Sequence, residues 1–136
     1  MEMEEKVREE LVSKLVEELE KRGEIVFAYL HGSSVEGGPF KDIDLAVYVD
    51  EAKVSKDKCL EYEITLAVDL QSSLSKPIDV KILNHAPLGF QYYATAGKLL
   101  LTRDDEKRVD FVTLARSLYL DFQIESQKYL WELARG

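Results

Sequence analysis

The chain has 136 residues, of which 46% are hydrophobic and 32% are charged, and its formal net charge is -8. This length and apolar content are enough for one domain that buries its own core without staples. The acidic balance argues against a protein that holds long nucleic acids by neutralising their phosphates. The lone Cys59 excludes an internal disulfide and a thiolate zinc cluster, which fits a reducing compartment.

The N-terminal segment is charged and amphipathic, and it lacks the apolar core and cleavage site of a signal peptide. Nowhere does an apolar run reach the length of a membrane-spanning helix. We therefore expect a cytoplasmic protein with no membrane partner, in which residues 1–136 form a single domain.

The first predicted element is an amphipathic helix from Glu4 to Arg22. Its apolar side chains recur every four positions, at Val7, Leu11, Leu15 and Leu19. Gly23 follows as a helix stop. The run Ile25–His31 is rich in β-branched and aromatic residues and predicts a buried strand that ends at Gly32.

A loop with Gly37, Gly38 and Pro39 leads to a second predicted strand, Asp42–Val49. Successive side chains of a strand point to opposite faces. One face therefore carries Ile43, Leu45, Val47 and Val49, and the other carries Asp42, Asp44, Ala46 and Tyr48. This is a strand with two carboxylates on one side.

Helical spacing from Ser55 to Ser75 predicts a second helix, which Pro77 ends before a strand at Ile78–Leu83. A short helix begins near Pro87 and runs to about Ala96, with Gly97 as its cap. A brief edge strand, Lys98–Thr102, precedes a long closing helix over about 104–135, either continuous or broken once. The predicted fold class is α/β (α+β): a small mixed sheet flanked by helices, with a long C-terminal helical segment.

The residues with chemical potential cluster after the first strand and on the next two. Gly32 lets the backbone approach a ligand closely, and Ser33 can donate its N–H and its hydroxyl to phosphate oxygens. Asp42 and Asp44 share one side of a strand, with side-chain origins about 6 to 7 Å apart. Asp79 interrupts an apolar strand. Three carboxylates beside a phosphate-binding turn match two-metal phosphoryl transfer with Mg²⁺.

Other polar and aromatic residues allow two interpretations each. His31 either bonds local backbone or contacts phosphate, and Lys81 is either a solvated charge or a triphosphate ligand. The remaining candidates are aromatic side chains that either fill the core or form a partner-binding patch. They are Tyr92, Tyr93, Tyr119, Phe122, Tyr129 and Trp131.

Two segments together resemble a known family. His31-Gly32-Ser33 with Asp42-Ile43-Asp44-Leu45-Ala46-Val47 is similar to the signature of the DNA polymerase β nucleotidyltransferase superfamily, specifically its minimal nucleotidyltransferase (MNT) branch. The stretch Ile78–Leu88 looks like the third-carboxylate strand and the Leu-Asn-X-Ala-Pro turn of the antitoxin subgroup. Gly97–Leu101, Arg108, Phe111 and Tyr119-Leu120-Asp121 extend the likeness over nearly the whole chain.

The resemblance implies a nucleotidyltransferase fold that uses ATP and two Mg²⁺ ions. In this branch an antitoxin pairs with a helical HEPN toxin, an RNase, and silences it by transferring AMP to a tyrosine. By similarity, Gly32 and Ser33 grip the triphosphate, Asp42 and Asp44 hold the metals, and Asp79 helps to activate the tyrosine hydroxyl as a further catalytic and metal-binding residue.

Two alternative functions stay open. The first is an antitoxin that masks its toxin by binding, without catalysis. It is suggested by a loop between Ser33 and Asp42 that is shorter than is usual in the family, and by Glu36 where an arginine is common. The second is a small-molecule nucleotidyltransferase of the antibiotic-modifying kind. It has less support because the chain carries no obvious second substrate-binding domain.

Overall fold

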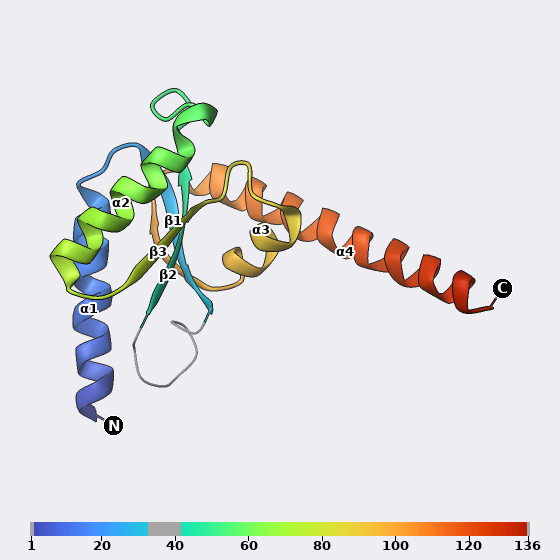
Figure 1. Ribbon diagram of the computed structural model, residues 1–136, viewed down its shortest axis with the longest axis horizontal. Helices are drawn as coiled ribbons and strands as arrows, with labels where there is room; N and C mark the ends of the chain where they lie inside the picture. The colour runs from blue at the N-terminus through green and yellow to red at the C-terminus, as the bar shows by residue number, and fades with distance from the viewer. Residues whose placement is uncertain (1, 33–41, 136) are drawn as a thin grey trace.

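The computed structural model describes residues 2–32 and 42–135, and its elements follow the predicted order (Figure 1). They are α1 (Glu2–Glu20), β1 (Ile25–His31), β2 (Ile43–Val49), the 3₁₀ helix η2 (Lys56–Lys58), α2 (Cys59–Leu74), β3 (Ile78–Ile82), α3 (Leu88–Thr95), β4 (Lys98–Thr102) and α4 (Asp105–Arg135). The predicted α+β class is confirmed. The predicted turn residues Ser33, Gly37, Gly38 and Pro39 lie outside the described residues, as does Glu36.

The strands form a four-stranded sheet in the order β3-β2-β1-β4. β1 runs antiparallel to both β2 and β4, whereas β2 and β3 are parallel. Two parallel strands need a connection that crosses back over the sheet, and α2 supplies it. The sheet is therefore mixed, as the sequence predicts.

Helices α1 and α2 cover one face of the sheet. The core on this face includes Leu15 and Leu19 of α1, Leu66, Leu70 and Leu74 of α2, Ile43, Leu45, Val47 and Val49 of β2, and Ile78, Val80 and Ile82 of β3. Burying each such side chain contributes about 1.5–3 kcal/mol. The apolar face predicted for β2 is thus confirmed as the core face.

Helix α3 and the first turns of α4 pack against the other face. Phe27 stacks on Tyr48 with ring centroids 4.8 Å apart, and the ring of Phe111 lies 5.8 Å from that of Phe27. Ala46, Leu83 and Ala94 complete this smaller cluster. The cluster fills the part of the face that lies toward the C-terminal end of β2, which leaves the part near Asp44 for polar residues.

The helix α4 is continuous from Asp105 to Arg135, so the break that the sequence allowed is absent. Its first half is anchored by Phe111 and Ala115, but its second half projects from the body (Figure 1). Phe122, Tyr129 and Trp131 on this projecting half are 62 to 63% exposed. Of the helices in the described part of the chain, none is long and apolar enough to cross a membrane.

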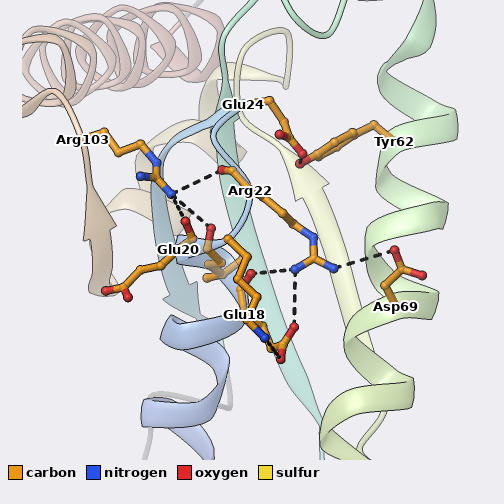
Figure 2. A network of polar contacts seen from close by, with 9 residues as sticks. Glu18, Glu20, Arg22, Glu24, Tyr62, Asp69 and Arg103 are labelled. Atoms are coloured by element: carbon orange, nitrogen blue, oxygen red, sulfur yellow. Dashed lines mark hydrogen bonds and ion pairs between the residues drawn. The ribbon is translucent and has the colours of Figure 1, made fainter.

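A cluster of polar contacts ties the end of α1 to β4 and α2 (Figure 2). Arg103, which directly follows β4, donates from Nη2 to the Glu20 carbonyl at 2.6 Å and from Nε to the Ile25 carbonyl at 2.9 Å. The last carbonyls of a helix have no partner within the helix. Arg103 therefore acts as a C-terminal cap that is supplied from a distant strand.

Two further contacts in this cluster reach α2 (Figure 2). Arg22 donates to the Glu18 carbonyl at 2.6 Å, and its Nη2 lies 3.7 Å from Asp69 Oδ2 on α2. The Tyr62 hydroxyl donates to Glu24 Oε1 at 2.8 Å. Burial and this bond to Glu24 raise the pKa of Tyr62 above its ordinary value. The first helix is thereby fixed in position on the sheet.

Replacing Arg103 tests this cap. We expect Arg103→Ala to lower the free energy of unfolding by about 1–3 kcal/mol, because several carbonyls lose a charged donor. Urea unfolding followed by circular dichroism measures the change. Arg103→Lys keeps the charge but loses the planar fork, so it should recover only part of the loss. An Arg103→Ala protein as stable as the wild type would contradict the capping role.

Candidate active site

Strand register places three of the candidate residues in one row across the sheet. His31 of β1 is the register partner of Asp44 of β2, and Asp44 is the register partner of Asp79 of β3. Neighbouring strands lie about 4.8 Å apart, so the two carboxylates start from adjacent backbone positions. Asp44 and Asp79, which are separated by 35 positions in the sequence, thus become neighbours.

The same row lies on the face opposite α1 and α2. In β3 the burial alternates, with Ile78, Val80 and Ile82 in the core and Asp79 and Lys81 exposed. Asp44 is partly buried and Asp42, just before β2, is exposed. Asp44 and Asp79 therefore lie on the sheet face opposite α1 and α2. Asp42, which the sequence placed on the same side as Asp44, precedes β2 at the edge of the row.

Gly32 brings the backbone against the Asp44 carboxylate. Its φ is +66°, a left-handed conformation that glycine adopts readily. A Cβ placed on Gly32 would lie 2.8 Å from Asp44 Oδ2. Only glycine fits here without displacing the carboxylate. The sequence predicted that Gly32 lets the backbone approach a ligand, and the approach found in the structure is to Asp44.

A second glycine closes the turn between α3 and β4 against the end of β1. A Cβ on Gly97 would collide with the Leu30 carbonyl oxygen and would lie 3.2 Å from the Cα of His31. The sequence predicted Gly97 only as a helix cap, whereas its tighter constraint is this contact with β1. Gly97 thereby helps to fix the backbone on which His31 and Gly32 stand.

His31 is half-buried beside the carboxylates. Its ring meets the edge of Phe90 of α3, with centroids 5.3 Å apart. Burial lowers the pKa of His31, and the negative charges of Asp44 and Asp79 oppose that shift without cancelling it. The imidazole therefore stays neutral more readily than an exposed histidine would. Phe90 was not predicted as a site residue, because its contact with β1 is visible only once α3 is placed.

Arg108 and Tyr119 of α4, which extend the family likeness in the sequence, make contacts within the fold. Arg108 donates to Asp105 at 2.6 Å and to the Tyr29 hydroxyl at 2.8 Å, and both contacts raise its pKa. Tyr119 stacks on Tyr92 of α3 with centroids 4.3 Å apart. These contacts hold α4 against β1 and α3. They therefore fix the position of the helices that flank the site.

The carboxylates of the row are the candidate ligands of Mg²⁺. Within 2–32 and 42–135, no group of three His, Cys, Asp or Glu side chains is arranged to hold a metal ion by itself. Mg²⁺ usually takes one or two carboxylates and completes its shell with water and substrate phosphates. The adjacent carboxylates Asp44 and Asp79, with Asp42 nearby, supply that kind of donor set. The residues fit a cation that binds together with a triphosphate.

A groove of about 590 Å³ lies at the end of β3, and neither Asp44 nor Asp79 is part of its lining. It is lined by the start of α2, the end of β3, the following turn and Phe90 of α3. The sequence did not indicate this groove. Its walls come from segments far apart in the chain, and Lys81 is the residue of this lining that the sequence had suggested as a ligand contact.

The comparisons with known proteins agree with this geometry. The model of the family described as polymerase beta, nucleotidyltransferase matches residues 13–106, which is more than half of the chain. No curated protein matches the sequence.

Several solved structures have the same fold. A chain of a mutant MntA–HpeT toxin–antitoxin complex is 25% identical, with a TM-score of 0.68 and coverage of 89% of this chain and 95% of that one. A structure of a tri-AMPylated HEPN toxin of Shewanella oneidensis with an MNT antitoxin contains a chain that is 22% identical, with a TM-score of 0.68 and coverage of 93% and 98%. A toxin–antitoxin complex with AMP-PNP contains one that is 22% identical, with a TM-score of 0.68 and coverage of 90% and 97%.

The close approach at Gly32 can be tested by adding a methyl group. Gly32→Ala should lower the free energy of unfolding by about 1 kcal/mol or more, because the new Cβ meets Asp44 and the left-handed backbone becomes strained. Gly89→Ala is the matched control. Gly89 lies in α3, and a Cβ there would meet only Tyr119 Cε2, at an ordinary van der Waals distance of 3.8 Å. Urea unfolding compares them. If both variants match the wild type, the tight approach is absent in solution.

Proposed function

Because the chain belongs to the polymerase β nucleotidyltransferase family, we propose that it is a Mg²⁺-dependent adenylyltransferase antitoxin that transfers AMP from ATP to a tyrosine of a HEPN RNase toxin. The observation that carries the proposal is the register pair of Asp44 and Asp79 beside the left-handed Gly32. Asp44 and Asp79 supply carboxylate oxygens for a cation. Gly32 supplies a backbone turn beside them that suits phosphate oxygens.

Each residue has a defined role in the proposed reaction. Asp42 and Asp44 hold Mg²⁺, which when bound neutralises the triphosphate and the departing pyrophosphate. The turn at Gly32 and Ser33 binds the phosphate oxygens and orients the α-phosphate. Asp79, which also contributes to the metal site, accepts a proton from the acceptor hydroxyl.

The chemical step is an in-line displacement. The tyrosine oxygen attacks the α-phosphorus of ATP and forms a new P–O bond. The bond from the α-phosphorus to the oxygen bridging the β-phosphate breaks, and pyrophosphate leaves. The hydroxyl proton passes to the Asp79 carboxylate. The product is a tyrosine that carries AMP through a phosphodiester, which places bulk and negative charge on the toxin.

The toxin is proposed as a protein partner on three grounds. The comparison structures with this fold come from toxin–antitoxin complexes. The projecting half of α4 exposes large apolar side chains such as Phe122 and Trp131, a feature of interaction surfaces. The net charge of -8 suits a basic RNase. With a partner of this kind, the location that we propose for the protein is the cytoplasm.

Intact-mass spectrometry tests the transfer directly. A candidate HEPN toxin encoded with this protein is incubated with it, Mg²⁺ and each of the four nucleoside triphosphates in turn. We expect the toxin mass to rise by one or more nucleoside monophosphates with ATP, and Asp44→Asn to abolish the increase while the protein stays folded. An increase that survives in Asp44→Asn would contradict the proposed site.

The same experiment judges the alternative of masking without catalysis. The exposed apolar face of the outer half of α4 is the observation that favours it. A stable complex that inhibits the RNase, with no mass increase, would establish masking in place of transfer. Modification of a small hydroxylated compound but not of the toxin would establish the small-molecule enzyme.

Thermal unfolding tests the metal site without any toxin. At a Mg²⁺–ATP concentration about ten times the dissociation constant, ligand binding should stabilise the wild type by about 1.4 kcal/mol relative to NaCl of equal ionic strength. Asp79→Asn should lose most of this gain. Asp110→Asn removes an exposed carboxylate on α4, outside the site, and should keep it. Equal gains in both variants would remove Asp79 from the proposed metal site.

A further inference from the structure

The groove beside β3 has the features of a ligand site. Its volume of about 590 Å³ lies within the range of small-molecule pockets. β3 is the last strand on its side of the described sheet, so the groove runs along its outer edge between α2 and α3. Phe90 forms part of its wall and also touches His31. Through Phe90 the groove is connected to His31, the register partner of Asp44.

The order of the strands separates the turn proposed to bind the triphosphate from the carboxylate proposed to take the acceptor proton. The turn at Gly32 follows β1, Asp44 is on β2, and Asp79 is on β3. A triphosphate held at Gly32 lies toward β1, and the residue proposed to take the acceptor proton stands toward the groove. Lys81, on the same exposed face two positions after Asp79, lines the groove itself. An acceptor bound in the groove would therefore lie on the Asp79 side of the row, next to Lys81.

The lining of the groove is cationic although the protein as a whole is acidic. Lys56 and Lys81 contribute two positive charges. Glu63, also in the lining, accepts the backbone N–H of Ile82 at 3.0 Å, which engages its carboxylate. His85 lies 3.6 Å from Glu51. The lining thus carries two lysines against one glutamate, which favours a ligand with negative charge even though the whole chain has a net charge of -8.

Apolar side chains form the rest of the wall. Leu60 is 68% exposed, and with Pro87 and Phe90 it offers a surface on which an aromatic ring can pack. A ligand that satisfies both parts of the lining has an aromatic ring and acidic groups near it. A tyrosine side chain on a protein segment with neighbouring Asp or Glu residues meets both requirements.

We propose that this groove is the acceptor subsite, and that it binds a tyrosine-bearing segment whose flanking side chains are acidic. The inference rests on the proposed function, because a tyrosine hydroxyl is the acceptor of the transfer. It adds the sequence character of the acceptor and the residues that select it: Lys56 and Lys81 for charge, and Leu60 and Phe90 for the ring.

Binding is tested first without catalysis. Two short peptides, one with glutamates on both sides of a tyrosine and one with lysines there, are titrated into ¹⁵N-labelled protein, and amide chemical shifts are followed by NMR. The glutamate peptide should shift the amides of Lys81, Ile82 and Phe90 and should bind more tightly than the lysine peptide. Equal affinities, or shifts that avoid the groove, would overturn the proposal.

Charge reversal at the groove supplies the matched comparison. Lys56→Glu should weaken the glutamate peptide by about three- to tenfold. Lys58→Glu is the control, because Lys58 belongs to the same 3₁₀ helix but lines a separate surface pocket with Lys53 and Tyr62. Lys58→Glu should leave the affinity unchanged. Equal losses in both variants would show a general charge effect and overturn the assignment to this groove.

Kinetics with the intact toxin separate this inference from the proposed function. Lys56→Glu should raise KM for the toxin and leave the dissociation constant for ATP unchanged. Weaker ATP binding in Lys56→Glu would assign the groove to the nucleotide and overturn the proposal. If the wild type transfers nothing, the proposed transfer fails, while the peptide titration still decides whether the groove binds its predicted ligand.

Discussion

The site depends on the register between β2 and its two neighbours. Asp44 pairs with His31 across an antiparallel ladder and with Asp79 across a parallel one. Because side chains alternate along a strand, a slip of one residue in β3 would turn Asp79 into the core and expose the apolar residues beside it. Core packing of Ile78, Val80 and Ile82 opposes that slip. The apolar face of the sheet therefore holds the polar face in alignment.

The two faces of the sheet divide stability and function between them. Helices α1 and α2 cover one face with a continuous apolar core, and Arg103 and Arg22 fix the end of α1 through charged donors. On the other face, the aromatic cluster around Phe27 and Phe111 covers only part of the sheet. The uncovered part carries Asp44 and Asp79. This face can carry exposed carboxylates because the opposite face already supplies the core.

The helices α3 and α4 complete the site from the side. Phe90 of α3 touches His31 and lines the groove, and Tyr92 stacks on Tyr119 to hold α3 to α4. Arg108 joins α4 to Tyr29 of β1. The walls of the groove are thus connected to the helix whose outer half projects from the body. A partner bound along α4 would meet the same structural unit that lines the groove.

The sequence by itself determined the order of the elements and the mixed sheet, and it supplied Asp42, Asp44 and Asp79 as candidate site residues. Local patterns carry this information: alternation in Asp42–Val49 separates core from site residues, and the glycine after Ile25–His31 signals a close approach. Only the tertiary structure decided that Asp44 and Asp79 are register partners, that Gly97 presses on β1 and that Phe90 faces His31. The groove was equally beyond the sequence, because its lining joins residues from α2, β3 and α3. Contacts between distant segments depend on strand pairing and helix packing, and neither leaves a periodic signal along the chain.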